Sequence, residues 1–140
     1  MSDFKRLIVW RKSHALALAI HRAAARIRGV MYSSLRSQMV RAALSIPANI
    51  VEGRGQASDR EFARYLRSSL NSSSELEYHL ISARDTGVMA NSEYVSLLAQ
   101  TIEVRRMLNG LLNTLDKGPK RKRRPNCEND EGNSAGTEKS

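Results

Sequence analysis

Cysteine, aromatic residues and long apolar runs are all scarce in this sequence of 140 residues. The single cysteine, Cys127, excludes an intramolecular disulfide and a zinc site built from several cysteines. No apolar run approaches the roughly 20 residues that a membrane-spanning helix needs, and the first residues lack the apolar segment of a signal peptide. A free thiol suits a reducing compartment. We therefore expect a cytoplasmic protein with no membrane segment.

Aromatic residues account for only 5% of the chain, so its core must be built from aliphatic side chains. The alternation of Val, Ile, Thr and Tyr that marks β-strands is nearly absent. Hydrophobic residues at 41% and charged residues at 26% are ordinary for a soluble domain, and the length suffices for one domain with its own core. These features predict an all-α fold.

Apolar residues recur at three- and four-residue steps in four segments, as in amphipathic helices. We expect helices over residues 4–28, 33–54, 58–85 and 91–117. The third segment has a heptad-like series, which is typical of helices packed side by side. The series consists of Phe62, Leu66, Ser69, Ser73, Leu76, Leu80 and Ala83. Residues 1–117 are therefore predicted to form an antiparallel, up-down four-helix bundle.

Several residues mark the expected helix ends. Gly29 can take the left-handed conformation that terminates the first helix. Ser33 or Ser34 is placed to cap the second helix. Ser58 and Glu61 have the S-x-x-E spacing of a capping box, in which each side chain satisfies a backbone N–H of the other residue.

The sequence after Lys117 changes in character. A basic run is followed by a polar stretch that contains four acidic residues. The basic run is Lys120, Arg121, Lys122, Arg123 and Arg124. Such a segment cannot bury enough apolar surface to order itself. We expect residues 118–140 to be a disordered C-terminal tail, first basic and then acidic.

The net charge of +9 is concentrated in the first half of the chain. Residues 1–54 carry ten Lys and Arg against two acidic residues, or +8, whereas residues 55–116 carry −2 and residues 117–140 carry +3. This asymmetry predicts a polyanionic partner and self-association of basic on acidic faces. Phosphate contacts give affinity without reading sequence. The candidate nucleic-acid-binding residues are Arg11, Lys12, Arg22, Arg26, Arg41 and Arg54, with Lys120, Arg121, Lys122, Arg123 and Arg124 as a flexible arm.

The second helix contains Pro47 and a polar stripe. Because Ile50 continues the apolar pattern beyond Pro47, we expect the proline to kink the helix rather than end it. The polar stripe leaves three interpretations open: a solvated face, a hydrogen-bonded network near the kink or a subunit interface, and a nucleic-acid surface. It consists of Gln38, Arg41, Ser45, Asn49 and Glu52. Asn49 and Glu52 fit the network better, because a carboxylate repels phosphate.

Other candidate sites have simple structural explanations. Gly53-Arg54-Gly55 could cradle a phosphate before the third helix, although a tight turn accounts for it equally. His14 and His21 share a helix face, but a zinc site needs three or four ligands. The serines of the third helix lack a nucleophile-elbow motif and a general base. We expect no catalytic residue, metal or cofactor, and we interpret the chain as a non-enzyme.

Three stretches of the sequence together resemble a known family. They are the Leu7-x-Val-Trp10 motif, the segment 38–55 with Ser45-Ile-Pro47-x-Asn49-Ile-x-Glu52-Gly53, and Ser58-x-x-Glu-Phe62 with Ser74-Glu-Leu-Glu77. The chain resembles the bacterial four-helix-bundle family S23, or 23S rRNA intervening sequence proteins, over roughly residues 5–115. The resemblance makes Ser45, Pro47, Asn49, Glu52 and Gly53 a structural motif.

A more distant similarity is to the accessory variability proteins of diversity-generating retroelements. Those are basic bundles that form barrel-shaped pentamers and bind nucleic acid and a reverse transcriptase. The resemblance therefore implies a homo-oligomer, a pentamer, with nucleic acid as its partner.

Two functional hypotheses follow from the sequence. The first is a nucleic-acid-binding oligomer, with RNA favoured over DNA, that acts through its basic surface. The second is a protein-interaction scaffold whose oligomer docks a partner such as a reverse transcriptase, with the charge asymmetry serving assembly alone. A salt-sensitive affinity for RNA distinguishes the first from the second.

Overall fold

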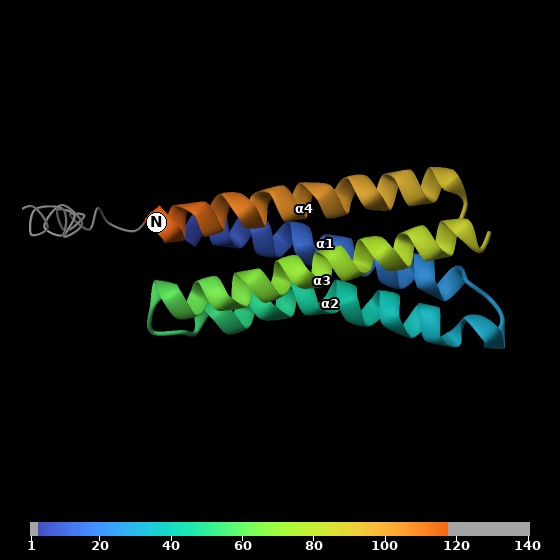
Figure 1. Cartoon of the computed structure of the whole chain (residues 1–140), viewed down its shortest axis with the longest axis horizontal. Coiled ribbons are helices and arrows are strands. Elements are labelled where there is room, and N and C mark those ends of the chain that lie inside the picture. The colour runs from blue at the N-terminus through green and yellow to red at the C-terminus, as the bar shows by residue number, and fades with distance from the viewer. Residues whose placement is uncertain (1–2, 118–140) are drawn as a thin grey trace, which may run out of the picture.

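The computed structural model describes residues 3–117, which form four long helices (Figure 1). Helix α1 spans Asp3–Arg26, and a 3₁₀ turn, η1 (Val30–Tyr32), leads into α2 (Ser33–Arg54). Helix α3 spans Asp59–Asp85 and α4 spans Asn91–Lys117. The predicted tail, residues 118–140, lies outside the described residues.

Each helix packs against two neighbours, in the order α1–α2–α3–α4 and back to α1. Consecutive helices run in opposite directions, so that the α2–α3 turn lies at the same end as the N-terminus (Figure 1). The α2–α3 seam is the most extensive and the α1–α4 seam the least. The all-α class and the antiparallel up-down four-helix bundle predicted from the sequence are confirmed.

The apolar stripes of the four helices meet in a single core. All seven residues of the heptad-like series of α3 are buried, including Ser69 and Ser73. On α1 the series Val9, Leu16, Ile20 and Ala23 is buried, and so is Ile27, the residue after the helix end. Burial follows the predicted spacing on both helices. The spacing of the apolar residues therefore determines which face of each helix is turned towards the core.

The α1–α2 connection differs from the prediction in two ways. Helix α1 ends at Arg26, two residues early, and Gly29 has a φ of 110° in the loop rather than at the helix end itself. Neither Ser33 nor Ser34 caps α2: the N-cap is Tyr32, without a side-chain hydrogen bond. The preceding turn η1 supplies backbone acceptors instead, because Ser33 N–H bonds to the carbonyl of Val30. A side-chain cap is therefore not needed there.

Helix α3 is capped at both ends, although its capping box is only half formed. The Ser58 hydroxyl accepts a hydrogen bond from Glu61 N–H at 3.1 Å, but the Glu61 carboxylate points to Arg64 at 3.5 Å instead of back to Ser58. At the other end Gly87 has a φ of 84°, and Val88 N–H bonds to the carbonyl of Ala83 at 3.1 Å. A hydrogen bond from an N–H to the carbonyl five residues earlier is characteristic of the Schellman motif that ends a helix.

Pro47 lies inside α2 and is buried, and the helix continues beyond it to Arg54, as predicted. The angle of the expected kink stays a prediction. Within residues 3–117, no helix is both long and apolar enough to span a bilayer.

Candidate nucleic-acid interface

Most acidic residues of α3 and α4 pair with basic side chains within the bundle. Every carboxylate from Glu61 to Asp116 has a basic side chain within 3.5 Å. Three of these pairs lie within α3, and the other four bridge helices. Between residues 5 and 116, only Glu52 and Asp59 remain without one. Exposed pairs of this kind are worth little to stability, but they neutralise the negative field of the surface.

The basic residues of α1 and α2 are mostly free of such partners. Six of the ten Lys and Arg between residues 5 and 54 make no ion pair, hydrogen bond or aromatic contact with the described residues. They are Lys5, Arg11, Arg22, Arg28, Arg41 and Arg54, and all are exposed. The unpaired charge of the bundle is therefore almost entirely positive and is concentrated on two helices.

Two of the predicted nucleic-acid-binding residues have a structural contact instead. Lys12 lies 3.0 Å from Glu103, and Arg26 pairs with Glu93, so both connect α1 to α4. Lys12 is 54% and Arg26 61% exposed, which leaves part of each cation accessible to solvent. The same pairs show that these two carboxylates have partners within one chain. The expected assembly of basic on acidic faces stays a prediction. The run Lys120–Arg124 lies outside the described residues.

Part of the polar stripe of α2 faces α3 and not the solvent. The hydroxyls of Ser45 and Ser72 are 2.8 Å apart, and Asn49 donates to the Ser45 hydroxyl at 3.0 Å. Close by, Ser69 donates to the carbonyl of Ile46 at 2.8 Å. These bonds form a network along the α2–α3 seam. Glu52 is not part of it: the side chain is exposed, like that of Arg41.

The Gly53-Arg54-Gly55 turn does not offer a phosphate cradle. Gly53 is buried within α2, and the N–H groups of Gly55 and Gln56 already donate to the carbonyls of Glu52 and Gly53, at 3.2 and 3.1 Å. A phosphate would need these donors to be free. The segment ends α2 and leads into the tight turn before α3, in agreement with the interpretation of this motif as a turn.

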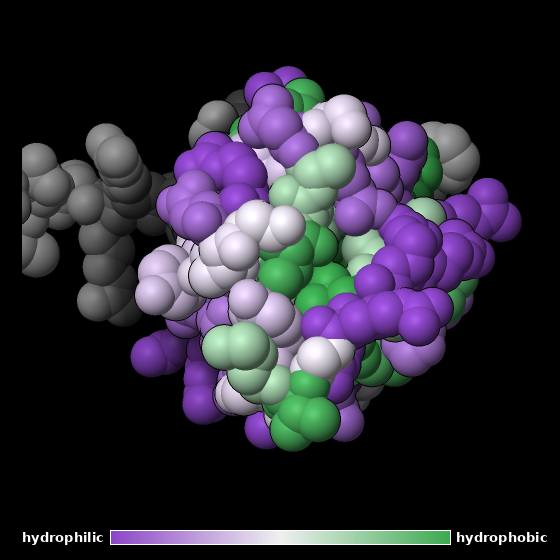
Figure 2. All heavy atoms as spheres, turned by 90° about the vertical axis from the view of Figure 1, so that its right-hand side faces the viewer, coloured by the Kyte–Doolittle hydropathy of each residue, from purple (hydrophilic) through white to green (hydrophobic). Residues whose placement is uncertain are grey.

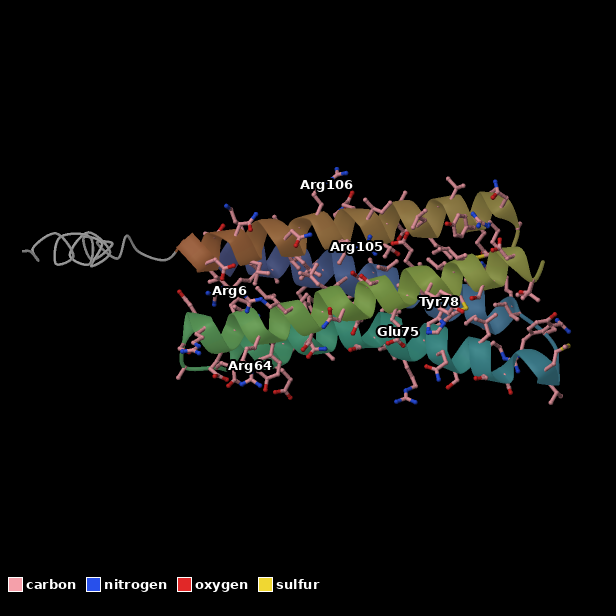
Figure 3. All side chains as sticks on the ribbon, viewed as in Figure 1. Arg6, Arg64, Glu75, Tyr78, Arg105 and Arg106 are labelled. Carbon is pink, nitrogen blue, oxygen red and sulfur yellow. The ribbon has the colours of Figure 1, made fainter. Side chains whose placement is uncertain are left out.

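An aromatic contact lies at the same end of the bundle. Phe62 packs directly against Gly53, and the Arg6 guanidinium lies over the Phe62 ring, 4.5 Å from its centroid. Arg6 comes from α1 and Phe62 from α3, the helix diagonally opposite (Figure 3). The contact is a cation–π interaction across the end of the core.

A polar clamp between α3 and α4 was not anticipated from the sequence. Arg105 donates to the Glu77 carboxylate at 2.7 Å and to the Ser73 hydroxyl and carbonyl, both at 3.2 Å. The Arg105 side chain lies between the two helices, whereas its neighbour Arg106 points away from the bundle (Figure 3). Arg105 and Glu77 are 27% and 32% exposed. Glu77 belongs to the Ser74-Glu-Leu-Glu77 motif of the family resemblance. Its partner Arg105 could not be identified from the sequence, because the pairing depends on how α3 and α4 are rotated relative to each other.

The histidines do not assemble a metal site in the described part of the chain. No group of three or more His, Cys, Asp or Glu side chains comes together there. His14 stacks on Trp10 with the ring centroids 5.1 Å apart and the planes 5° from parallel, and His21 is exposed on the same face of α1. Among the serines of α3, Ser69 and Ser73 are fully buried and bond to backbone carbonyls.

Comparisons with known proteins agree with this architecture. The sequence profile of a family described as 23S rRNA-intervening sequence protein matches residues 5–110. A crystal structure at 1.70 Å resolution, of a protein of unknown function from the S23 ribosomal protein family of Bacteroides thetaiotaomicron VPI-5482, has a TM-score of 0.71. The two chains are 24% identical over 78% of this chain and 98% of that one, and at this identity the similarity concerns the fold. Among curated proteins, none matches this sequence.

Proposed function

Because the chain belongs to the 23S rRNA-intervening sequence protein family, we propose that it is a non-enzymatic RNA-binding protein of the cytoplasm. Binding takes place through the basic surface of α1 and α2. The family description names an intervening sequence of 23S rRNA, and this favours RNA over DNA as the polyanion. No cofactor is required, since phosphate contacts need only positioned cations and hydroxyls.

The observation that carries the proposal is the imbalance of unpaired charge. Among the described residues, six cations of residues 5–54 have no partner. Six of the seven carboxylates from Glu61 to Asp116 pair with Lys or Arg, and the seventh, Glu75, lies beside His79. If the asymmetry served only to join basic and acidic faces of neighbouring copies, the carboxylates of α3 and α4 would be free for that purpose. Instead the surplus positive charge is left for a partner from outside the bundle.

We propose that the protein acts as a homo-oligomer, a pentamer as the family resemblance implies. In the sequence of α4, Leu98, Ile102 and Leu112 widen the apolar face beyond what one helix-packing seam requires. Leu112 is in fact buried and Leu98 half-buried in the core of the same chain. Ile102 remains 38% exposed, and Val95, seven residues earlier on the same face, is 54% exposed. These two side chains support an interface on the outer side of α4.

A protein-docking scaffold is the second candidate function. Val30 and Met31 in the α1–α2 connection are 89% and 81% exposed. Figure 2 looks onto this end of the bundle and shows hydrophobic residues at its surface between hydrophilic ones. Exposed apolar residues of this kind suit a protein partner, such as a reverse transcriptase, better than phosphate.

The decisive experiment measures RNA affinity as a function of salt concentration. If six phosphates are contacted on a single strand, the logarithm of the affinity should fall with a slope of about −4 against the logarithm of the salt concentration. Purification with and without nuclease, followed by sequencing of the bound strand, identifies the RNA. A chain that binds no RNA at low salt, yet retains a protein from cell extract after nuclease treatment, would favour the scaffold.

A further inference from the structure

A groove of about 410 Å³ runs between the second half of α1 and the first half of α2. Its apolar part is formed by Ala24, Ala25 and Val40. The polar part consists of His21, Ser33, Arg36, Ser37 and Arg41, and no acidic residue lines it. The volume lies in the range of roughly 300–1,000 Å³ that is usual for small-ligand sites.

Arg36 is held in place at this groove by the end of α1. Its Nη1 donates to the carbonyls of Ile27 and Gly29, at 3.0 and 2.8 Å. Both carbonyls lie in the loop just after α1, and the guanidinium joins them, with the Gly29 carbonyl also accepting from Tyr32 N–H at 3.1 Å. The N–H groups on Nε and Nη2 make no hydrogen bond with the described residues. Arg36 is thus a cation whose position is fixed in advance and whose remaining donors are available to an anion.

The other polar side chains complete an anion site. Arg41 is exposed and unpaired, and it lines the groove together with the hydroxyls of Ser33 and Ser37. Arg and Ser side chains are typical phosphate ligands, and no carboxylate opposes them here. The charge of the groove therefore matches a phosphodiester group.

The apolar part of the groove distinguishes a nucleotide from a bare anion. Ala24 is nearly fully buried and lies at the floor, whereas the exposed Ala25 and the half-buried Val40 present a small apolar surface beside the cations. The face of an unpaired base can lie on such a surface, whereas the bases of a duplex are stacked inside it and expose only their edges. A single strand therefore fits better than a helix of RNA.

From this arrangement we infer that the α1–α2 groove holds one nucleotide of single-stranded RNA. The phosphate is bound by Arg36 and Arg41, and the base rests on Ala24, Ala25 and Val40. The inference rests on the proposed RNA-binding function and specifies where on the basic surface the strand is seated. Because no polar group faces the apolar part in a fixed pattern, the groove takes any base without reading its identity.

Two substitutions of equal charge test the groove. Ser37→Glu introduces a carboxylate among its phosphate ligands, and Ser34→Glu introduces one three residues earlier, outside the lining residues. Both serines are exposed near the start of α2, where a negative charge is favourable for the helix. We expect Ser37→Glu to weaken the binding of a short single-stranded RNA by roughly tenfold or more. Ser34→Glu should cost only a small factor.

Nuclear magnetic resonance of the histidine rings locates the ligand independently. The chain has three histidines. His21 lines the groove, whereas His79 lies on α3 beside Glu75 and has a side chain only 14% exposed. Titration with the single-stranded RNA should shift the His21 resonance and leave that of His79 unchanged. Inorganic phosphate alone should shift His21 only at much higher concentration.

The outcomes separate the inference from the function on which it rests. Equal weakening by Ser37→Glu and Ser34→Glu, with no shift of His21, would show that RNA binds to the general positive field and would overturn the groove. A His21 shift caused by phosphate but not by RNA would show a free-anion site and would also overturn it. If the unsubstituted full chain binds no RNA at low salt, the proposed function itself fails.

Discussion

Gly53 and Phe62 lie so close that a Cβ built on Gly53 would stand 2.5 Å from Cδ1 of the Phe62 ring. The same Cβ would be 3.0 Å from Cβ of Tyr65, which cannot move without α3. Gly53 therefore lets α2 and α3 converge at the end of the bundle where the two helices are joined. It also explains why a glycine follows Glu52 and why an aromatic residue stands at position 62.

The first prediction concerns this contact. Gly53→Ala should destabilise the fold, because overpacking costs about 1–3 kcal/mol, whereas the gain in helix propensity is only about 1 kcal/mol. Gly110→Ala is the matched control, since Gly110 is also helical and its Cβ would meet nothing within 4 Å. The control should stabilise the protein by about 0.5–1 kcal/mol. Urea unfolding measures both, and equal effects would contradict the close approach.

A second prediction tests the α3–α4 clamp. Arg105→Ala leaves the half-buried Glu77 carboxylate and the Ser73 carbonyl without their donor, and it should cost about 1–3 kcal/mol of unfolding free energy. Arg106→Ala removes an exposed arginine with no partner in the described residues and should change stability by less than about 0.5 kcal/mol. Thermal unfolding of the two variants provides the comparison. Equal unfolding temperatures for the two variants would show that the contacts of Arg105 do not stabilise the fold.

The third prediction addresses the basic surface. Reversal of two unpaired cations of α1, Arg11→Glu with Arg22→Glu, should weaken RNA binding and reduce its salt dependence. The double reversal of Arg60 and Arg106, the unpaired cations of α3 and α4, changes the net charge equally and should have a smaller effect. Helicity should be unchanged in both, since all four side chains are exposed. Equal losses of affinity would show that net charge alone governs binding.

Deletion of residues 118–140 forms the fourth prediction. Residues 118–140 carry a net charge of only +2, so they offer fewer net phosphate contacts than the basic surface of α1 and α2. The deletion should therefore weaken RNA binding by less than the double reversal on α1 does. Electrophoretic mobility-shift assays compare the RNA affinity of the deletion variant with that of the double reversal. If the deletion abolishes binding, the tail and not the bundle is the RNA-binding element.

The fifth prediction is the state of assembly. Native mass spectrometry should find a homo-oligomer, a pentamer. Val95→Glu combined with Ile102→Glu should dissociate it, because assembly would then bury two unpaired charges in the interface. Gln100→Glu combined with Asn113→Glu adds the same charge at polar exposed positions of α4 and serves as the control. A monomer of 15.7 kDa at high concentration would refute the assembly.

The fold could be predicted from the sequence because it depends on local patterns. Helix periodicity placed Leu66, Leu76 and Leu80 in the core, and it needed no knowledge of how the helices face one another. The first turn of α2 was mispredicted because the sequence favours a serine cap, while the chain forms a 3₁₀ turn there instead.

The candidate site was less predictable than the fold. Sequence shows that Arg11, Arg22 and Arg26 share a face of α1, but not that Glu93 on α4 lies opposite Arg26 alone. Whether a cation is free depends on the rotation and stagger of two helices far apart in the chain. The groove residue Arg36 was missed for the same reason, since its partners Ile27 and Gly29 are backbone carbonyls that carry no sequence signal.

Only one of the four seams, α1 against α4, joins helices that are not consecutive in the chain. During synthesis, α1, α2 and α3 can pack together as soon as residue 85 has left the ribosome, because contacts local in sequence form first. The salt bridges Lys12–Glu103 and Arg26–Glu93 must wait for α4. Until that helix emerges, both cations stay unpaired, so the nascent chain presents two more positive charges than the finished protein.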